Sequence, residues 1–136
     1  MPNRTINKSI KINASPDKVW RVFADPEITK EMGGKYATDW KEGNAIGWQG
    51  LDGTMITNGT ILDLEPGKLL KHNLFSPDYK GVVTSVITYQ LHENNGQTTL
   101  FAVEELADDI TDAGYNAASE GWDAALLLVK KIAEQL

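Results

Sequence analysis

Few side chains in this sequence could do chemistry, since it has two histidines and no cysteine. His72 shares alternate-residue parity with Leu70 and Leu74, so the pattern predicts an imidazole that points into the interior. An inward histidine could orient a ligand carbonyl or act as an acid or base near neutral pH. The competing interpretation is a core histidine paired within the protein, and we favour it because buried polar groups usually find partners.

An acidic side chain is the second candidate. Glu104 shares parity with Leu100 and Ala102 and could face the interior, where burial would raise its pKa and let it donate a hydrogen bond to a ligand. The opposite face of this segment carries Phe101 and Val103 and is equally apolar, so parity leaves the face undecided. We favour an exposed Glu104, because carboxylates in a run are normally solvated.

The sequence predicts no metal, no cofactor and no catalytic residue. The acidic run from Glu104 to Asp112 lacks the alternating oxygen ligands and central glycine of a calcium loop. His72 and His92 form no recognisable metal-ligand set, and we expect His92, beside the Asn95-Gly96 turn, to be exposed and without a role. Nucleophile elbows, phosphate loops and dinucleotide fingerprints are absent from the sequence.

Large aromatic side chains complete the predicted binding site. They could form the walls of a pocket, although packing is the more common role of such residues. With His72 and Glu104, the candidates are Trp40, Trp48, Phe75, Tyr89, Tyr115 and Trp122.

Composition limits the functional class. A chain of 136 residues with 41% hydrophobic and 24% charged residues predicts a single domain over residues 1–136. The net charge of -6 argues against nucleic acid or an anionic membrane as the main partner, because phosphate binding requires clustered Lys and Arg. The first twelve residues contain no apolar signal core, and no segment is apolar enough for membrane insertion. We expect a cytoplasmic protein.

The N-terminal region predicts one strand followed by two short helices. Ile6, Ile10 and Ile12 alternate with polar residues, as in a half-buried strand. Ser15 can cap a helix that begins at Pro16 and ends at Asp25-Pro26. A second helix should end at Gly33-Gly34, because glycine adopts the left-handed conformation typical of helix ends.

The central region predicts antiparallel strands joined by tight turns. Turn sequences such as Asp52-Gly53 and Asn95-Gly96 separate the apolar runs. We expect the Asn58-Gly59 pair to form a bulge within a long strand, and residues 76–81 to form a longer loop. The expected strands are 35–40, 44–50, 55–65, 68–75, 82–92 and 97–105.

The C-terminal region predicts one long helix from about Ala113. Its apolar residues recur at steps of three and four, which places them on one face: Tyr115, Ala118, Trp122, Ala125, Val129, Ile132 and Leu136. A coiled coil is the alternative, but the sheet needs a cover, so we expect the helix to pack on it. The fold class is therefore α+β, with a curved antiparallel sheet of about six or seven strands around a long C-terminal helix.

The order of these elements resembles the START-like (SRPBCC, helix-grip) superfamily over nearly the whole chain. The resemblance is carried by the Ser15-Pro16 cap, Val19-Trp20, Asp25-Pro26 and Gly121-Trp122. Three further segments are most similar to single-domain homologues of the activator of heat-shock protein 90 ATPase: Trp40-Lys41-Glu42-Gly43, Gly59-Thr60-Ile61 leading to Glu65-Pro66-Gly67-Lys68-Leu69-Leu70, and Gly96-Gln97-Thr98-Thr99-Leu100. The resemblance implies a helix-grip fold with a cavity and a link to the stress response. The co-chaperone that names the group has an additional N-terminal domain, for which this chain has no room, so chaperone activation is not implied.

Three functional hypotheses follow. The first is non-catalytic binding of a small hydrophobic molecule between the sheet and the C-terminal helix, with His72 as its polar contact, which requires a real void. The second is a co-chaperone-like module that docks a chaperone or other protein, through the outer sheet face or the acidic residues around Glu105 and Asp108, and has a filled interior. The third is a cyclase-type or hydrolase-type enzyme that uses His72 and an acid.

Overall fold

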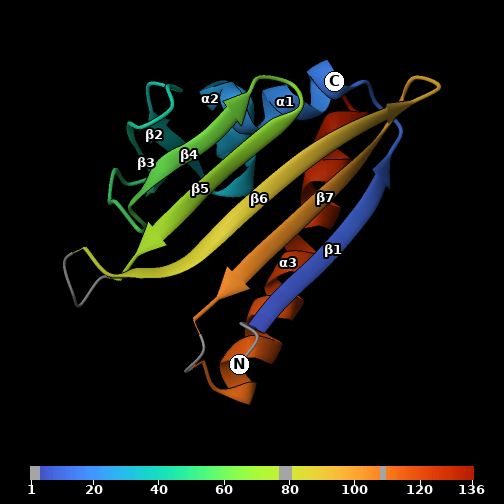
Figure 1. Ribbon diagram of the computed structural model, residues 1–136. Coiled ribbons are helices and arrows are strands. Elements are labelled where there is room, and N and C mark those ends of the chain that lie inside the picture. Colours follow the sequence, from blue (N-terminus) through green and yellow to red (C-terminus); the bar gives the residue numbers. More distant parts are fainter. Residues whose placement is uncertain (1–3, 77–80, 108–109) are drawn as a thin grey trace.

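The computed structural model describes residues 4–76, 81–107 and 110–136 (Figure 1). Most of the expected loop at 76–81, together with Asp108 and Asp109, lies outside the described residues. The elements in chain order are β1 (Arg4–Ile12), α1 (Pro16–Ala24), α2 (Pro26–Thr29), the 3-10 helix η1 (Lys30–Met32), β2 (Gly34–Thr38), β3 (Ala45–Gly50), β4 (Gly59–Glu65), β5 (Leu69–Phe75), β6 (Val83–Asn94), β7 (Gln97–Leu106) and α3 (Asp112–Glu134).

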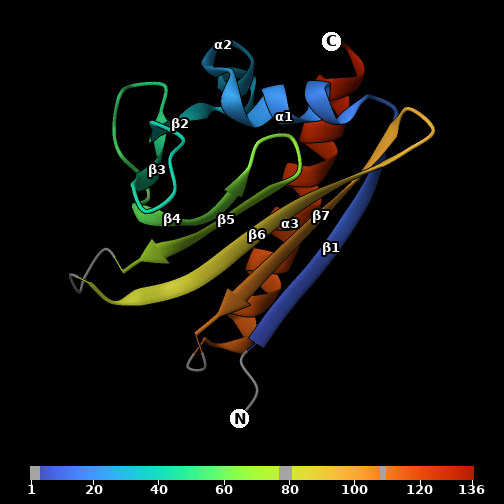
Figure 2. The same ribbon diagram turned by 45° about the horizontal axis from the view of Figure 1, so that its top comes forward.

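The seven strands form one antiparallel sheet in the order β1-β7-β6-β5-β4-β3-β2. The helix α3 crosses one face of this sheet behind β6, β7 and β1, while α1 and α2 lie at the end where α3 finishes (Figures 1 and 2). The strands bend around the helices, most visibly in β6 (Figure 2). The predicted α+β helix-grip arrangement is therefore confirmed.

The N-terminal elements follow the predicted pattern. Ile6 and Ile12 are buried, as their alternation indicated. The hydroxyl of Ser15 accepts a hydrogen bond from the amide of Lys18 and so caps α1. Gly33 ends η1 in the left-handed conformation, with φ of 95°.

The strand expected at 55–65 begins later than predicted. The amides of Ile56 and Thr57 both donate to the carbonyl of Trp48, which is incompatible with a regular ladder, and β4 starts only at Gly59. Ile56 is 62% exposed, so the segment before β4 gains little from packing as a strand.

Gly59 has a different role from the expected bulge. A Cβ atom at this position would lie 1.9 Å from the carbonyl oxygen of Asn73 on β5, so only glycine permits β4 to start this close to its neighbour. The shift in strand register falls further along, between Ile61 and Asp63.

The strand expected at 35–40 ends early, at Thr38, because side chains take over the hydrogen bonds of the backbone. The hydroxyl of Thr38 accepts from the amide of Trp40, and the carboxylate of Asp39 accepts from the amide of Lys41. Trp40 is thereby held at a φ of 59°, outside the strand.

The helix α3 packs on the sheet through an apolar face, as predicted. Its buried residues are Leu126, Val129, Ile132 and Ala133, all in its second half. Before Leu126, the sheet-facing residues include the small Ala118 and Ala125, which remain partly accessible.

Polar contacts to β1 fix the first half of α3. Lys8 pairs with Asp123 at 3.0 Å, and the hydroxyl of Tyr115 donates to the carbonyl of Thr5 at 3.1 Å. Arg4 pairs with Asp112 at the start of the helix. These contacts lie at the edge of the sheet and leave its centre to other side chains.

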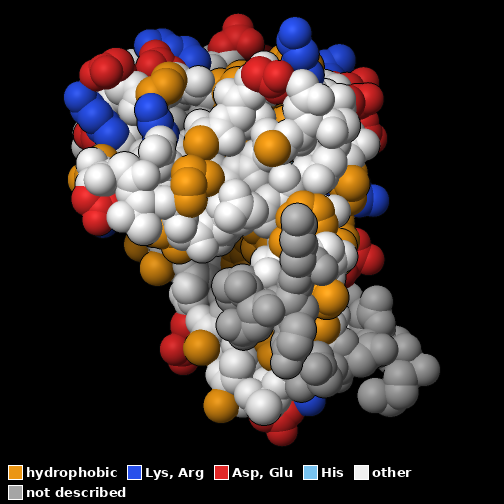
Figure 3. Space-filling view, turned by 90° about the vertical axis from the view of Figure 1, so that its left-hand side faces the viewer, with side chains coloured by type: hydrophobic (Ala, Val, Ile, Leu, Met, Phe, Trp, Pro, Cys, Tyr) orange, Lys and Arg blue, Asp and Glu red, His pale blue; other side chains and the backbone are white. Residues whose placement is uncertain are grey.

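The described surface carries few large apolar side chains, and none of the described helices could cross a membrane. Leu51, Met55 and Ile56 are exposed on the segment between β3 and β4. This segment lies on the side of the molecule that faces the viewer in Figure 3, where hydrophobic side chains occur in small groups.

The buried hydroxyl of Thr29 generates a test of the fold. It contacts the carbonyl oxygens of Val22, Phe23 and Asp25, at 2.6, 3.1 and 2.8 Å, and so joins α1 to α2. We expect Thr29→Val to lower the free energy of unfolding by roughly 1–3 kcal/mol in urea denaturation, because the carbonyls lose their buried partner.

The matched control is Thr88→Val on the outer face of the sheet, where the threonine hydroxyl has no partner among the described residues. It should leave stability within about 0.5 kcal/mol of the original protein. Equal effects of the two substitutions would contradict a bridging role for Thr29.

Candidate functional site

Six rings from six elements meet between the sheet and the helices. We call them the aromatic cluster: Phe23 of α1, Tyr36 of β2, Trp48 of β3, His72 of β5, Tyr89 of β6 and Trp122 of α3. Their closest ring centroids are 4.9 to 6.5 Å apart, within or near the range in which aromatic rings attract each other. The sequence prediction of an aromatic interior next to His72 agrees with this arrangement.

His72 is the most buried polar ring of the cluster, with 4% of its surface exposed. Its Nδ1 atom lies 3.0 Å from the carbonyl oxygen of Asn73. Its Nε2 atom is buried and has no hydrogen-bond partner among the described residues. The histidine is thus inward, as predicted, but only one of its nitrogens is satisfied.

Burial lowers the pKa of His72, and the Asn73 hydrogen bond and the negative charge of Glu104 oppose this shift only in part. The neutral imidazole therefore predominates at neutral pH. Because a carbonyl oxygen only accepts hydrogen bonds, Nδ1 carries the ring hydrogen and Nε2 is left as an acceptor. An acceptor cannot donate to a ligand carbonyl, so this tautomer does not suit the carbonyl-orienting role considered from the sequence.

Glu104 faces the interior, which corrects the expectation that it is exposed. It is 9% accessible and follows the buried Leu100 and Ala102, whereas Phe101 on the other face is 37% exposed. Its carboxylate accepts a hydrogen bond of 2.9 Å from the indole Nε1 of Trp122. The indole donor comes from α3, far along the chain, and offsets the cost of burying the acid.

Two tyrosine hydroxyls meet beside His72. The hydroxyl oxygens of Tyr36 and Tyr89 are 3.4 Å apart, and both rings lie within 6.5 Å of the imidazole. Burial raises the pKa of both tyrosines, so both hydroxyls stay protonated at neutral pH.

Two spaces adjoin the aromatic cluster. The first, which we call the inner void, measures about 30 Å³ and is enclosed by Val22, Phe23, Met32, Tyr36, Trp48, Tyr89, Trp122, Ala125, Leu126 and Val129. The second, which we call the helix groove, measures about 220 Å³ and opens to solvent between Tyr89, Glu104, Ala118, Gly121, Trp122 and Ala125. Trp122, Tyr89 and Ala125 border both spaces and separate them.

His72 belongs to the aromatic cluster but lines neither space, and the remaining candidates lie apart from both. Trp40 packs against Trp20 and Tyr36 outside both linings, at ring distances of 5.7 and 5.8 Å. Tyr115 stacks under Arg4 at the edge of the sheet. Phe75 is half-buried at the end of β5. A shift in strand register between Leu74 and Phe75 interrupts the alternation of inward and outward side chains before this residue.

Seven residues that line the inner void were not among the site candidates from the sequence, and three of them, Phe23, Met32 and Tyr36, are large side chains from α1, η1 and β2. Tyr36 could have been found, because it has the same parity as Trp40 in the expected strand. Phe23 and Met32 were assigned to short helices, and no periodic pattern says which helical residue reaches across to a sheet.

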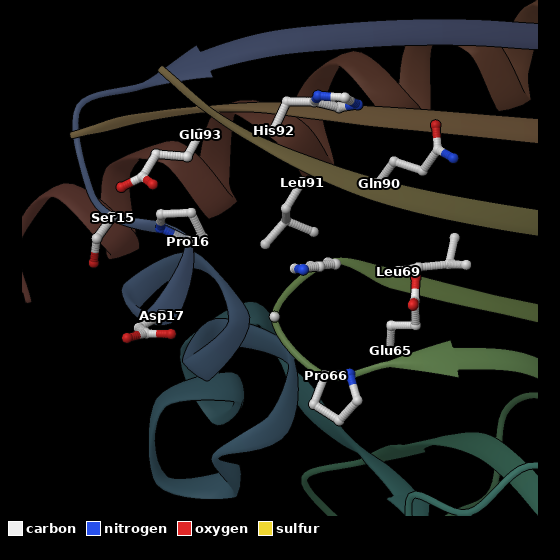
Figure 4. A pocket seen from close by; sticks show the side chains of 12 residues that line it. Ser15, Pro16, Asp17, Glu65, Pro66, Leu69, Gln90, Leu91, His92 and Glu93 are labelled. Carbon is white, nitrogen blue, oxygen red and sulfur yellow. The ribbon is translucent and has the colours of Figure 1, made fainter. Parts of the chain in front are cut away.

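A larger cleft of about 590 Å³ lies at the other end of β6 (Figure 4). The start of α1, with Asp17, faces the turn at Glu65 and Pro66 across the side chain of Leu91 (Figure 4). The charged side chains in this cleft are exposed. Solvated charges recognise ligands weakly, so we place the candidate site at the aromatic cluster. No group of described residues has the composition and spacing of a metal site.

Comparisons with known proteins agree with the fold. The family model described as Activator of Hsp90 ATPase homolog 1-like protein matches residues 13–134. A search of curated proteins found no significant match.

Several solved structures share the architecture. The protein MLL2253 of Mesorhizobium loti is 20% identical, with a TM-score of 0.81, and the alignment covers 97% of this chain and 98% of that one. ChR145 of Cytophaga hutchinsonii is 27% identical, with a TM-score of 0.79 and coverage of 99% and 97%. The Aha1 protein of Colwellia psychrerythraea, whose solution structure is a dimer, is 20% identical, with a TM-score of 0.79 and coverage of 96% of both chains.

The buried imidazole predicts a pH dependence of stability. Since burial lowers the pKa of His72 in the folded protein, the unfolded chain binds a proton below about pH 6.5 that the folded protein does not bind. Stability should therefore fall as the pH falls from about 6.5 towards the lower, folded pKa. We expect the original protein to lose up to about 1.4 kcal/mol per pH unit more than His72→Phe in urea unfolding.

His92→Phe is the matched control, because His92 is exposed. Its unfolding free energy should change with pH as that of the original protein does. If the original protein and His72→Phe showed parallel pH dependences, the imidazole would not be buried in its neutral form.

Proposed function

This chain belongs to the family of Activator of Hsp90 ATPase homolog 1-like proteins, and we propose that it is a non-catalytic binding protein for a small, mainly apolar molecule. The ligand would lie between the sheet and α3, in the space that the inner void and the helix groove form together. We place this activity in the cytoplasm, in keeping with an acidic chain that has no cysteine.

The observation that carries the proposal is the position of Trp122 between two spaces of unequal size. The inner void of about 30 Å³ holds no more than a water molecule. The helix groove of about 220 Å³ exceeds the roughly 150 Å³ that suffices for benzene in an apolar protein cavity. A rotation of the Trp122 side chain would join them into one pocket lined by aromatic rings.

The contacts that hold Trp122 are few enough to exchange for a ligand. Its indole donates one hydrogen bond to Glu104 and meets Tyr89 edge-on at 5.6 Å. A hydrogen bond to a charged group contributes about 1.5–3 kcal/mol and an aromatic pair about 0.5–1.5 kcal/mol. A ligand that buries an aromatic ring in the same place can offset these losses.

Gly121 permits a test that does not disturb the core. It borders the helix groove, and a Cβ at this position would meet nothing within 4 Å. We expect Gly121→Leu to fill the groove and weaken binding of 2-naphthol at least about tenfold, measured by amide NMR titration. Its stability should be equal or greater, because leucine favours helix more than glycine by up to about 1 kcal/mol.

Ala124→Leu, exposed on the side of α3 opposite Trp122, is the matched control and should bind 2-naphthol as the original protein does. Shifts in the original protein should cluster at Tyr89, Trp122 and His72. Unchanged binding by Gly121→Leu would place the ligand elsewhere, and no binding of naphthalene compounds by the original protein would count against the proposal.

A second candidate function is a protein-interaction module of the co-chaperone type, favoured by the family and by one surface. Leu51, Met55 and Ile56 are exposed together, beside a hollow of about 310 Å³ that Lys30 and Lys35 border. An apolar patch with a basic rim suits an acidic and apolar partner surface. The outer sheet face and the acidic residues around Glu105 and Asp108 remain predicted docking surfaces, of which Asp108 lies outside the described residues, and this patch is an additional candidate.

We expect Ile56→Lys to weaken binding to a purified heat-shock protein 90 at least about tenfold in a low-salt titration, because it places a charge inside the apolar patch. Leu127→Lys is the control, since Leu127 is exposed on α3. Absence of binding by the original protein at low salt would rule out this second function for that partner.

A further inference from the structure

The hydrogen-bond donors and acceptors of the aromatic cluster are not all paired with one another. His72 Nδ1 donates to the carbonyl of Asn73 at 3.0 Å, so the buried Nε2 is an acceptor without a donor. The cluster therefore holds one acceptor that some other group must satisfy, because an unpaired buried polar atom is costly.

The tyrosine pair has the opposite excess. Tyr36 and Tyr89 have two hydroxyl hydrogens, and each hydroxyl has the other as its only partner among the described residues, at 3.4 Å. One hydrogen forms that bond, so the other has no acceptor. One donor of the tyrosine pair and one acceptor of His72 are thus left unpaired. The centroids of the two tyrosine rings lie within 6.5 Å of the centroid of the imidazole.

From this balance we infer that the ligand carries a neutral hydroxyl group on a ring-sized apolar body, and that this hydroxyl donates to Nε2 of His72 and accepts from the tyrosine pair. A hydroxyl is the simplest group that both donates and accepts at one atom. An ether or a ketone would satisfy only the tyrosine, and an amide needs two separated atoms. The inference rests on the proposed function, because the same pocket must admit the ligand, and because the movement of Trp122 must also expose Nε2 of His72, which lines neither space in the closed structure.

Charge in the pocket excludes the acidic analogues of such a ligand. The negative charge of Glu104 acts on His72, and its carboxylate lies at the helix groove, bonded to Trp122. A ligand carboxylate would be buried near a like charge and could not donate to Nε2. The site therefore selects aromatic or alicyclic alcohols over carboxylic acids.

The test compares three naphthalenes of nearly equal size by amide NMR titration of the full chain at pH 7.5: 2-naphthol, 2-methoxynaphthalene and 2-naphthoate. We expect 2-naphthol to bind about tenfold or more tighter than 2-methoxynaphthalene, the fold-change that an unpaired buried polar group costs, and 2-naphthoate to bind more weakly still. Long-range proton–nitrogen correlation spectra should show hydrogen on Nδ1 and none on Nε2. The Nε2 signal should shift with 2-naphthol and not with the ether.

His72→Phe keeps an aromatic ring and removes the acceptor, so it should bind the alcohol and the ether equally, and His92→Phe is its matched control.

If the original protein bound 2-naphthol and 2-methoxynaphthalene equally at this site, only water would satisfy Nε2 and the tyrosine; the inference would fail and the proposed function would stand. Hydrogen on Nε2 in the free protein would also overturn the inference. If none of the three bound, both would fail. The spectra and the affinity ratio need only the original protein, so they decide the matter even if His72→Phe does not fold.

Discussion

The helix α3 can pack closely on the sheet along only part of its length, because the size of its sheet-facing side chains changes. In its second half Leu126, Val129 and Ile132 are buried and form a close-packed layer. In the part before Leu126, Ala118 and Ala125 leave room, and Trp122 spans the gap from the helix to Glu104 in the sheet. Ion pairs join this part of the helix to the edge strand β1. The helix groove is the consequence, and Tyr89, Glu104 and Trp122 of the candidate site line it.

Two polar side chains of the interior, His72 and Glu104, lie near this groove because of strand register. His72, Ile87 and Glu104 are directly opposite one another on β5, β6 and β7, so the imidazole and the carboxylate share one row of the inner face. In a close-packed core these groups would destabilise the fold unless fully paired. Here Trp122 pairs the acid, while Asn73 pairs only half of the imidazole. The incompletely hydrogen-bonded imidazole therefore lies in the same aromatic cluster that borders the inner void and the helix groove.

Local patterns predicted the elements better than their ends. The alternation of Ile6 and Ile12, the cap at Ser15 and the periodicity of α3 are short-range signals, and each agrees with the structure. The start of β4 could not be predicted, because it depends on the close approach of Gly59 to a carbonyl on β5 rather than on turn chemistry.

The candidate site was predictable to the same extent. The parity of His72 was sufficient to show that it faces inward. The burial of Glu104 was not, because both faces of its strand are apolar and the deciding partner, Trp122, belongs to a distant helix. No sequence pattern reports that Asn73 fixes which nitrogen of His72 carries hydrogen, because this depends on the path of the backbone.

The free energy needed to move Trp122 bears on which ligands the proposed pocket would select. In the closed structure the space beneath Trp122 is about 30 Å³, so any larger ligand must meet the cost of moving the indole off Glu104. If that cost is about 3 kcal/mol, the sum of one charged hydrogen bond and one aromatic contact in their middle ranges, the apparent affinity falls roughly a hundredfold. Burial of an apolar ring alone offsets this cost for many compounds and does not distinguish among them. The hydrogen bonds left open at His72 and the tyrosine pair do distinguish among them, because only a ligand that satisfies both removes a cost already present in the free protein. In the proposed binding site, the backbone carbonyl of Asn73 would thus set the chemical class of the ligand, because it fixes the tautomer of one buried ring.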